Sequence, residues 1–295
     1  MPAYQRIGIT VKSDLSEKDA VLRSVIKTLK KAGSEVCVDR PRVAGLQSAK
    51  GLRAFTCEHD IDLLLVLGGD GTILRTVREL KNFSVPILSI NRGNIGFLAE
   101  MSVKEAPTLL PKFLAGQGII DERSVLNVRV HRKNKIIVDG FVLNEAVISQ
   151  GSIARLIDLK TTVNDEPLTI FRADGLILST PTGSTAYTLA AGGPIVHPQL
   201  SATILTPINS HSFSQKPIVI PADHRVDVEV MSRGSKYGGV DVSLTLDGQI
   251  YVALQPGDHI SSSVNEHTVK FLRRKKETFY ATLRTKLKWG ERPQE

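Results

Sequence analysis

Residues 66–72 read Val-Leu-Gly-Gly-Asp-Gly-Thr and end an apolar stretch that begins at Ile61. Because glycine has no side chain, a loop with three glycines lets phosphate oxygens approach main-chain N–H groups, and the start of a following helix adds partial positive charge. Asp70 is therefore placed to do chemistry on a phosphate donor. The same run is also typical of a tight turn in which Asp70 caps the next helix, and the loop alone does not separate these interpretations.

The first third of the chain alternates strand and helix patterns around this loop. The stretch 61–67 predicts a strand that is buried on both faces. A helix should open at Ser16 and close at Gly33, while Pro107 and Pro111 would break or kink another. We expect further strands at 7–11, 35–38 and 86–90, and helices at 73–80 and 102–114. The order predicts a Rossmann-like α/β domain over residues 1–120.

Beyond that point the apolar residues alternate, which favours a mostly antiparallel, β-rich domain over residues 121–270. Asn164-Asp165 and Asp247-Gly248 supply turn residues that tolerate positive φ between strand candidates. A basic segment, 271–295, should contain a helix at 278–289 that packs back on the first domain. The predicted strands of the second domain are 125–130, 136–142, 156–163, 226–230 and 240–246.

Composition fits a two-domain enzyme, since 295 residues with 41% apolar side chains can fill two cores. Residues 1–6 lack an apolar signal core, and no stretch approaches the roughly 20 apolar residues that cross a bilayer, so we expect a cytoplasmic protein without a membrane partner. Cys37 and Cys57 are too few for a disulfide scaffold and should be buried, reduced thiols. Their spacing indicates no structural metal site.

The net charge of +8 is concentrated near the end of the chain, where residues 270–292 contain nine Lys or Arg and two Glu. The run Arg273-Arg274-Lys275-Lys276 could steer anions or bind nucleic acid. Solvated surface is the favoured interpretation, because aromatic residues are only 5% of the chain and are not interleaved with these bases. Nucleic acid is therefore not expected as a partner.

Three further motifs follow the glycine loop in order. They are Asn144-Glu145, the run Thr-Pro-Thr-Gly-Ser-Thr-Ala-Tyr at 180–187, and Gly192-Gly193-Pro194. Together with the loop they resemble the NAD kinase family, and the resemblance runs from Ile7 to Trp289. Diacylglycerol and sphingosine kinases carry similar Gly-Gly-Asp-Gly loops, whereas the run at 180–187 points to the NAD kinases.

The resemblance implies that Asp70 takes the proton from the 2′-hydroxyl of the adenosine ribose of NAD. That hydroxyl attacks the γ-phosphate of ATP and gives NADP and ADP. The chemistry is sound without the resemblance, because a sugar hydroxyl is a poor nucleophile and a carboxylate within hydrogen-bond reach can remove its proton. Alignment and charge stabilisation are left to the glycine backbone, a divalent cation such as Mg²⁺ and a nearby side-chain cation. Arg75, one helical turn beyond Gly71, is the candidate cation, although an exposed helix arginine fits the pattern as well.

The amide and carboxylate of Asn144-Glu145, after the strand-like run 138–143, suit a pair of ribose hydroxyls. Tyr187 could stack on a base, and a Ser/Thr-rich turn before a helix is the structural alternative for its motif. The resemblance implies that the small Ala186 admits the substrate and that Phe97 walls the nicotinamide end. The resemblance extends the candidate binding residues to Gly68, Gly69, Asp70, Gly71, Arg75, Phe97, Asn144, Glu145, Arg155, Arg172, Asp174, Ser179, Thr185, Ala186, Tyr187, Thr188, Leu189, Ala190, Asn209 and Gln249.

Other functions account for fewer of these motifs. His197 and His211 lack a neighbouring carboxylate or second ligand and read as structural. There is no Gly-x-Gly-x-x-Gly fingerprint and no P-loop. A lipid kinase would share only the first motif, a non-catalytic NAD sensor would function without Asp70, and a nucleic-acid-binding protein would rely on the basic tail. The resemblance also implies a homodimer or homotetramer in which a neighbouring subunit contributes to the site.

Overall fold

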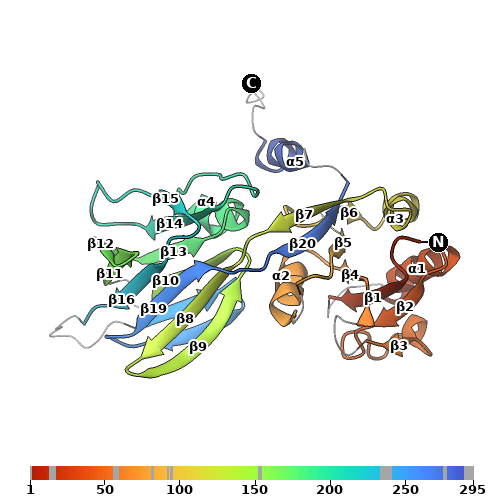
Figure 1. The fold of residues 1–295 in the computed structure, drawn as a ribbon, viewed down its shortest axis with the longest axis horizontal. Helices are drawn as coiled ribbons and strands as arrows, with labels where there is room; N and C mark the ends of the chain where they lie inside the picture. Colours follow the sequence, from red (N-terminus) through yellow and green to blue (C-terminus); the bar gives the residue numbers. More distant parts are fainter. Residues whose placement is uncertain are drawn as a thin grey trace. The chain divides into compact units, whose positions relative to one another are not determined.

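The computed structural model describes residues 2–12, 18–55, 60–80, 83–91, 93, 96–151, 155–232, 241–274 and 278–288. The chain forms two compact units (Figure 1): unit 1 is Met1–Glu122 with Val269–Glu295, and unit 2 is Arg123–Thr268. Several sequence predictions lie outside the described residues, namely those on Ser16, Cys57, Lys275, Lys276 and Trp289.

Unit 1 is an α/β unit whose described residues include an eight-stranded sheet in the order β3-β2-β1-β4-β5-β20-β7, with β6 beside β5. Strands β1 to β6 and β20 make parallel pairs with their neighbours. The elements are β1 (Arg6–Val11), α1 (Lys18–Lys31), β2 (Glu35–Val38), η1 (Gln47–Ala49), β3 (Arg53–Ala54), β4 (Leu63–Leu67), α2 (Asp70–Glu79), β5 (Ile87–Asn91), β6 (Met101–Ser102), α3 (Ala106–Leu114), β7 (Ile119–Arg123), β20 (Val269–Arg273) and α5 (Thr278–Leu287).

The core of unit 1 follows the predicted pattern. All five residues of β4 are buried, as expected for a strand covered on both faces. Helices α1 and α3 pack on each other and on alternate residues of β1 and β4. Gly33, with φ of +86°, follows the end of α1, so the predicted helix stop is confirmed.

Two helices of unit 1 begin elsewhere than the sequence predicted. Helix α2 starts at Asp70 rather than Ile73, because the Gly69 carbonyl already accepts the N–H groups of the third and fourth residues of this turn. Helix α3 starts at Ala106 rather than Ser102, and in the turn before it the Ser102 and Glu105 side chains each bond the other's backbone N–H. Pro107 lies in the first turn of α3, where its missing N–H costs little, and Pro111 lies inside the helix.

The described residues of unit 2 form two six-stranded antiparallel sheets, with strand orders β15-β14-β13-β10-β17-β18 and β12-β11-β16-β19-β8-β9. The inward faces of both sheets contribute to one apolar core. The elements are β8 (Leu126–Arg132), β9 (Lys135–Val142), β10 (Glu145–Gln150), β11 (Ile157–Val163), β12 (Glu166–Ala173), β13 (Gly175–Ser179), η3 (Thr182–Thr185), α4 (Tyr187–Ala190), β14 (Ala202–Ile208), β15 (Ile218–Pro221), β16 (Val226–Val230), β17 (Val242–Leu246), β18 (Ile250–Leu254) and β19 (His259–Val264).

Both predicted hairpin turns are present in unit 2. Asn164 and Asp165 have φ of 48° and 66° between β11 and β12, and Asp247 and Gly248 have φ of 50° and 63° between β17 and β18. The left-handed backbone favours these residue types, which is why the turns could be read from the sequence. The predicted α/β and antiparallel β-rich architecture is therefore confirmed.

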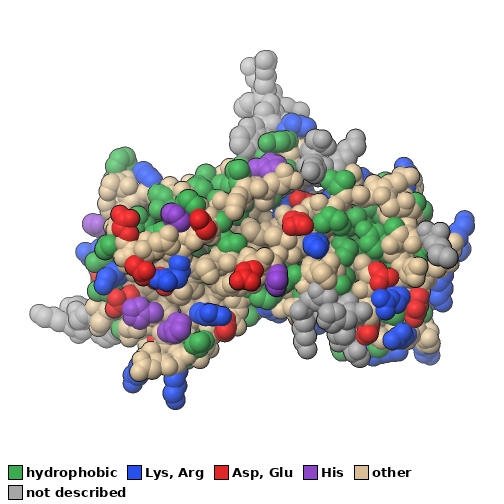
Figure 2. All heavy atoms as spheres, in the orientation of Figure 1, with side chains coloured by type: hydrophobic (Ala, Val, Ile, Leu, Met, Phe, Trp, Pro, Cys, Tyr) green, Lys and Arg blue, Asp and Glu red, His purple; other side chains and the backbone are tan. Residues whose placement is uncertain are grey.

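The sequence favoured solvated surface for Arg273 and Arg274, and this is wrong for both. Arg273 is 5% exposed because β20 lies between β5 and β7, and its guanidinium pairs with Glu100 and Asp121. Arg274 is half-buried and pairs with Glu100 and Glu105. On the face drawn in Figure 2, other Lys and Arg side chains lie among Asp and Glu.

No helix among the described residues is both long enough and apolar enough to span a membrane.

Candidate functional site

The glycine loop joins the carboxyl end of β4 to the first turn of α2. The Gly68 N–H donates to the Ile90 carbonyl of β5 at 2.9 Å, which fixes the loop to the sheet. Gly69 is the N-cap of α2 and Asp70 is the first helical residue. The Asp70 carboxylate accepts the backbone N–H groups of Phe97, at 2.9 Å, and Leu98, at 3.4 Å. The side chain of Asp70 thus faces a second loop and does not serve as the helix cap.

Two glycines let this arrangement form. A Cβ atom on Gly68 would overlap the Thr72 side chain, and one on Gly96 would overlap the Asp70 carboxylate. A Cβ on Gly71, in contrast, would meet no heavy atom of the described residues within 4 Å. The backbone at the start of α2 is therefore open to close approach, in a place where the helix dipole favours an anion.

Arg75 is largely enclosed, which removes the alternative of an exposed helix arginine. Its side chain is 17% exposed and lies 4.0 Å from Glu79. Its Nη2 donates to the Val11 carbonyl at a long 3.4 Å, and its Nε, the atom that faces Glu79, has no hydrogen-bond partner among the described residues. Burial, and secondarily the charge of Arg42, lowers the pKa of Arg75. A cation with so few hydrogen bonds, near the carboxyl end of β1, suits an incoming anion.

In unit 2 the turn at Asn144 is held from two directions. Oδ1 of Asp247 accepts the N–H groups of Asn144 (2.8 Å) and Glu145 (3.1 Å), and Oδ2 accepts that of Leu143 (2.9 Å). On the other side, Thr180 donates its N–H to the Asn144 carbonyl at 2.9 Å and its hydroxyl to the Leu143 carbonyl. This backbone is fixed before any ligand binds.

Glu145 begins β10 and is a buried carboxyl, 8% exposed. Its Oε2 has no hydrogen-bond partner among the described residues. Burial, together with the negative charge of Asp247, raises the pKa of Glu145 to about 8. The group is therefore mostly protonated at neutral pH and can donate a hydrogen bond as well as accept one.

The residues at 179–190 form a turn, η3 and the short α4, and most of their hydroxyls bond within the protein. Ser179 donates to the Thr180 carbonyl, and the Ser184 hydroxyl bonds both the N–H and the carbonyl of Val196. Thr182 accepts from Arg123. Ser179 and Thr188 are buried, Thr185, Ala186 and Leu189 are partly buried, and Tyr187 and Ala190 are exposed. Most of the hydroxyls thus build the turn, and Tyr187 and Ala190 present its outer surface.

Of the remaining candidates, Asp174 and Asn209 lie at the other end of the same sheet, whereas Gln249 lies in the same turn as Asp247, at the Asn144 end. Arg172 and Arg155 belong to the second sheet of unit 2 or directly precede it. Asn209 donates to the Asp174 carboxylate at 2.9 Å, where β13 begins and β14 ends. Arg172, on β12, is exposed nearby, and its carbonyl accepts the His211 N–H. Asp174 is separated from Ser179 by the length of β13, roughly 16 Å at the usual rise per residue. Arg155 precedes β11, and Gln249 is exposed in the β17–β18 turn.

The structure adds residues that sequence reasoning missed. Asp247 was read only as a turn residue, and Thr180 only as one hydroxyl of a polar run, yet both fix the Asn144 backbone. Leu98, which donates to Asp70, had no signal of its own beyond its place beside Phe97. No group of three His, Cys, Asp or Glu side chains in the described part of the chain could hold a metal ion.

We compared the chain with known protein families. Residues 7–118 match the model of the ATP-NAD kinase N-terminal domain, and residues 143–274 match that of the ATP-NAD kinase C-terminal domain. The chain belongs to the NAD kinase family. Asp70 falls within the first match, and the Asn144 turn, the run at 180–187 and Asp247 fall within the second.

Relatives within the family cover nearly all of the chain. An NAD kinase of Solibacter usitatus is 35% identical over 292 residues, covering 99% of this chain and 100% of that protein. An NAD kinase of Geotalea daltonii is 43% identical over 244 residues, covering 81% and 84%.

Solved structures share the fold. An NAD kinase from Archaeoglobus fulgidus in complex with ATP is similar with a TM-score of 0.73 at 26% identity, covering 96% of this chain and 99% of that one. Yeast NADH kinase complexed with NADH has a TM-score of 0.87 at 24% identity, covering 100% and 90%, and supports the fold alone.

Proposed function

We propose that the chain is an ATP-dependent NAD kinase in which Asp70 is the general base. The observation that carries the proposal is the placement of Asp70, whose carboxylate lies at the start of α2, is not used as a cap and is held by two N–H groups of another loop. The backbone beside it, at Gly71, is open to close approach. Membership of the NAD kinase family supports the choice of substrate.

The reaction forms one bond and breaks another. Asp70 accepts the proton of the adenosine ribose 2′-hydroxyl as that oxygen bonds the γ-phosphorus of ATP. The bond from the γ-phosphorus to the bridging oxygen breaks, so the products are NADP and ADP. General-base assistance of this kind is worth about 10²- to 10⁴-fold in rate. The rest of the acceleration comes from alignment and from charge stabilisation around the transferred group.

Arg75 and the partial positive charge at the start of α2 supply the protein's share of that charge stabilisation. The divalent cation is proposed to arrive as part of the MgATP substrate, because Mg²⁺ is commonly bound through substrate phosphates with one or two carboxylates. Excess EDTA should abolish NADP formation, and excess Mg²⁺ should restore it.

NAD is proposed to bind through the Asn144–Glu145 pair, with Tyr187 available for stacking on a base. Support comes from the rigid backbone at Asn144 and from a neutral Glu145, which can both donate to and accept from ribose hydroxyls. Tyr187 is 45% exposed and so is accessible to a ligand. The cytoplasmic location expected from the sequence stays a prediction.

We also infer a homodimer or homotetramer in which Arg172, Asp174 and Asn209 serve the site of a neighbouring subunit. The support is their position at the end of β13 remote from Ser179 and the following turn. Mixing two inactive variants, Asp70→Asn and Asp174→Ala, under conditions that exchange subunits should restore part of the activity. An active monomer in sedimentation at dilute concentration would contradict the inference.

The first experiment measures NADP formed from NAD, ATP and Mg²⁺ by the wild type and by Asp70→Asn, which keeps the shape but removes the base. We expect a loss of about 100-fold or more with NAD binding retained. Asp62→Asn is the matched control, because Asp62 also accepts two backbone N–H groups, those of Gln5 and Arg6, in unit 1. NAD binding without turnover by the wild type would indicate an NAD sensor, and neither binding nor turnover would favour a lipid kinase.

A further inference from the structure

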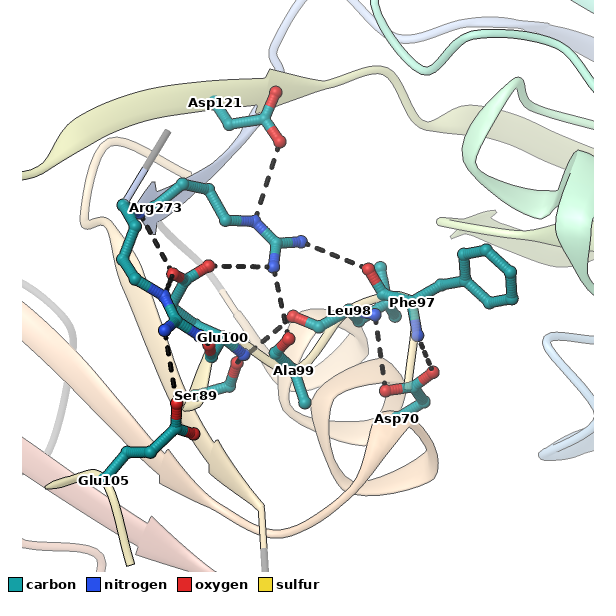
Figure 3. A network of polar contacts seen from close by, with 10 residues as sticks. Asp70, Ser89, Phe97, Leu98, Ala99, Glu100, Glu105, Asp121 and Arg273 are labelled. Carbon is teal, nitrogen blue, oxygen red and sulfur yellow. Dashed lines mark hydrogen bonds and ion pairs between the residues drawn. The ribbon is translucent and has the colours of Figure 1, made fainter. Parts of the chain in front are cut away.

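The loop that holds Asp70 is itself held by an arginine from the last strand of unit 1. Figure 3 shows the Arg273 guanidinium on one side of the segment Phe97–Glu100 and the Asp70 carboxylate on the other. Nη2 of Arg273 lies 3.4 Å from the Phe97 carbonyl oxygen, and Nη1 lies 3.5 Å from that of Ala99. The arginine therefore reaches the backbone of the segment that donates to Asp70.

One peptide group joins the two charges. The carbonyl of Phe97 and the N–H of Leu98 belong to the same planar peptide unit. Its oxygen accepts from Arg273, and its N–H donates to Oδ1 of Asp70 at 3.4 Å. A cation at the carbonyl end polarises the amide and strengthens the hydrogen bond that its N–H makes to the carboxylate. Arg273 thus both places and polarises one of the two donors that hold Asp70.

The guanidinium is itself fixed by buried groups. It pairs with Glu100 at 3.3 Å and with Asp121 at 3.7 Å, and its central carbon lies 5.4 Å from the ring centroid of Phe271. Glu100 in turn accepts the N–H and Nε of Arg274, and its own N–H donates to the carbonyl and hydroxyl oxygens of Ser89 on β5. The segment Phe97–Glu100 is thereby tied to two strands.

Stability alone does not account for this cluster. A buried ion pair is often no more stabilising than apolar residues of the same size, because the desolvation of both charges offsets their attraction. We propose that Arg273 is a positioning residue for Asp70, acting through the Phe97–Leu98 peptide group. The inference rests on the proposed function, since it concerns the residue that acts there as base.

The test is a double-mutant cycle on the full-length protein with Arg273→Lys and Asp70→Asn. Arg273→Lys keeps the charge but loses the fork that reaches both a carbonyl and a carboxylate. We expect it to lower kcat about tenfold with the KM values for NAD and ATP nearly unchanged. In the Asp70→Asn background the same substitution should change kcat less than about twofold, because the group it positions is already gone.

The control is Arg132→Lys in unit 2. Arg132 makes a two-point pair with the buried Asp258, at 2.8 and 2.9 Å, but none of its hydrogen bonds goes to the Phe97–Glu100 segment, so kcat should stay within about twofold. Melting curves show whether each variant is folded, and NAD titrations measure the fraction of it that binds NAD. If Arg273→Lys does not fold, the double variant Arg273→Met/Glu100→Met replaces the whole buried pair in the same cycle.

The outcomes separate the two claims. An equal loss from Arg273→Lys in both backgrounds, or a loss in KM rather than kcat, would overturn the inference and leave the proposed function intact. A wild-type kcat in the single Asp70→Asn variant would overturn the proposed function and the inference together.

Discussion

The Asp247 carboxylate accepts the backbone N–H of Asn144 at 2.8 Å, across 103 positions of the sequence. The same carboxylate bonds the N–H groups of the residues on either side of Asn144. A side chain in a hairpin turn thus determines the backbone of a proposed NAD-binding residue.

Replacing Asp247 by Asn should therefore weaken NAD binding. The amide leaves one acceptor oxygen for three donors and turns an NH₂ group toward N–H groups, so the Asn144 turn loses its fixed geometry. We expect the KM for NAD to rise about tenfold, with a smaller change in kcat. Asp165→Asn, in the other hairpin turn of unit 2, is the control. A Michaelis constant equal to that of the wild type would contradict the role given to Asp247.

Glu145 should make stability depend on pH. Its pKa is about 8 in the folded protein and near 4.5 when unfolded, so between these values the folded chain holds a proton that the unfolded chain has released. The stabilisation that this proton gives the folded chain is complete below pH 4.5 and is lost as the pH rises through 8. Glu145→Gln cannot titrate. The melting temperature of this variant minus that of the wild type should therefore increase by roughly 3 °C or more from pH 5 to pH 9.

An exposed residue provides the control for that measurement. Glu166→Gln, on β12, changes the same side chain at the surface and should show no such gain. Parallel curves for Glu145→Gln and the wild type across the whole pH range would disprove a neutral, buried Glu145.

Gly96→Ala should impair the proposed base, Asp70, although Asp70 itself is not substituted. Its Cβ would overlap the Asp70 carboxylate, which must then leave the N–H groups of Phe97 and Leu98. We expect kcat to fall about tenfold or more, as for loss of a catalytic alignment. Gly93→Ala is the control, since a Cβ there meets no heavy atom of the described residues within 4 Å. Equal activity of the two variants would argue against the observed position of Asp70.

Arg75→Ala should raise the KM for ATP about tenfold at saturating NAD, because a charge-assisted hydrogen bond to phosphate is lost. Arg75→Lys keeps the charge and should recover part of the loss. Arg78→Ala removes the same charge three residues further along α2 and should leave this KM near the wild-type value. An unchanged KM in Arg75→Ala would assign the residue to packing instead.

Local patterns allowed much of the fold to be predicted. The apolar run that became β4, the glycine that follows α1 and the turn at Asn164 each depend on neighbouring residues, so periodicity and turn chemistry were sufficient. The same holds for the glycine loop, although the sequence did not show that α2 begins at Asp70 itself.

Long-range relationships could not be read in this way. Arg273 looked like part of a solvated basic run because nothing nearby indicates that β20 joins the sheet between β5 and β7. Asp247 was recognised as a turn residue, but its acceptors face a segment far away in the sequence. Hydroxyls at 179–188 suggested ligand contacts, whereas several of them bond the backbone of their own turn.

The late position of β20 in the chain has a consequence for synthesis on the ribosome. Unit 2 is continuous and can fold as soon as it leaves the exit tunnel, but unit 1 must wait for its last strand. Until then the nascent unit has a gap between β5 and β7, and Glu100 lacks its ion-pair partners Arg273 and Arg274. The segment Phe97–Glu100, which holds Asp70, is therefore completed among the last events of folding, so a chain released before residue 274 should lack that assembled segment.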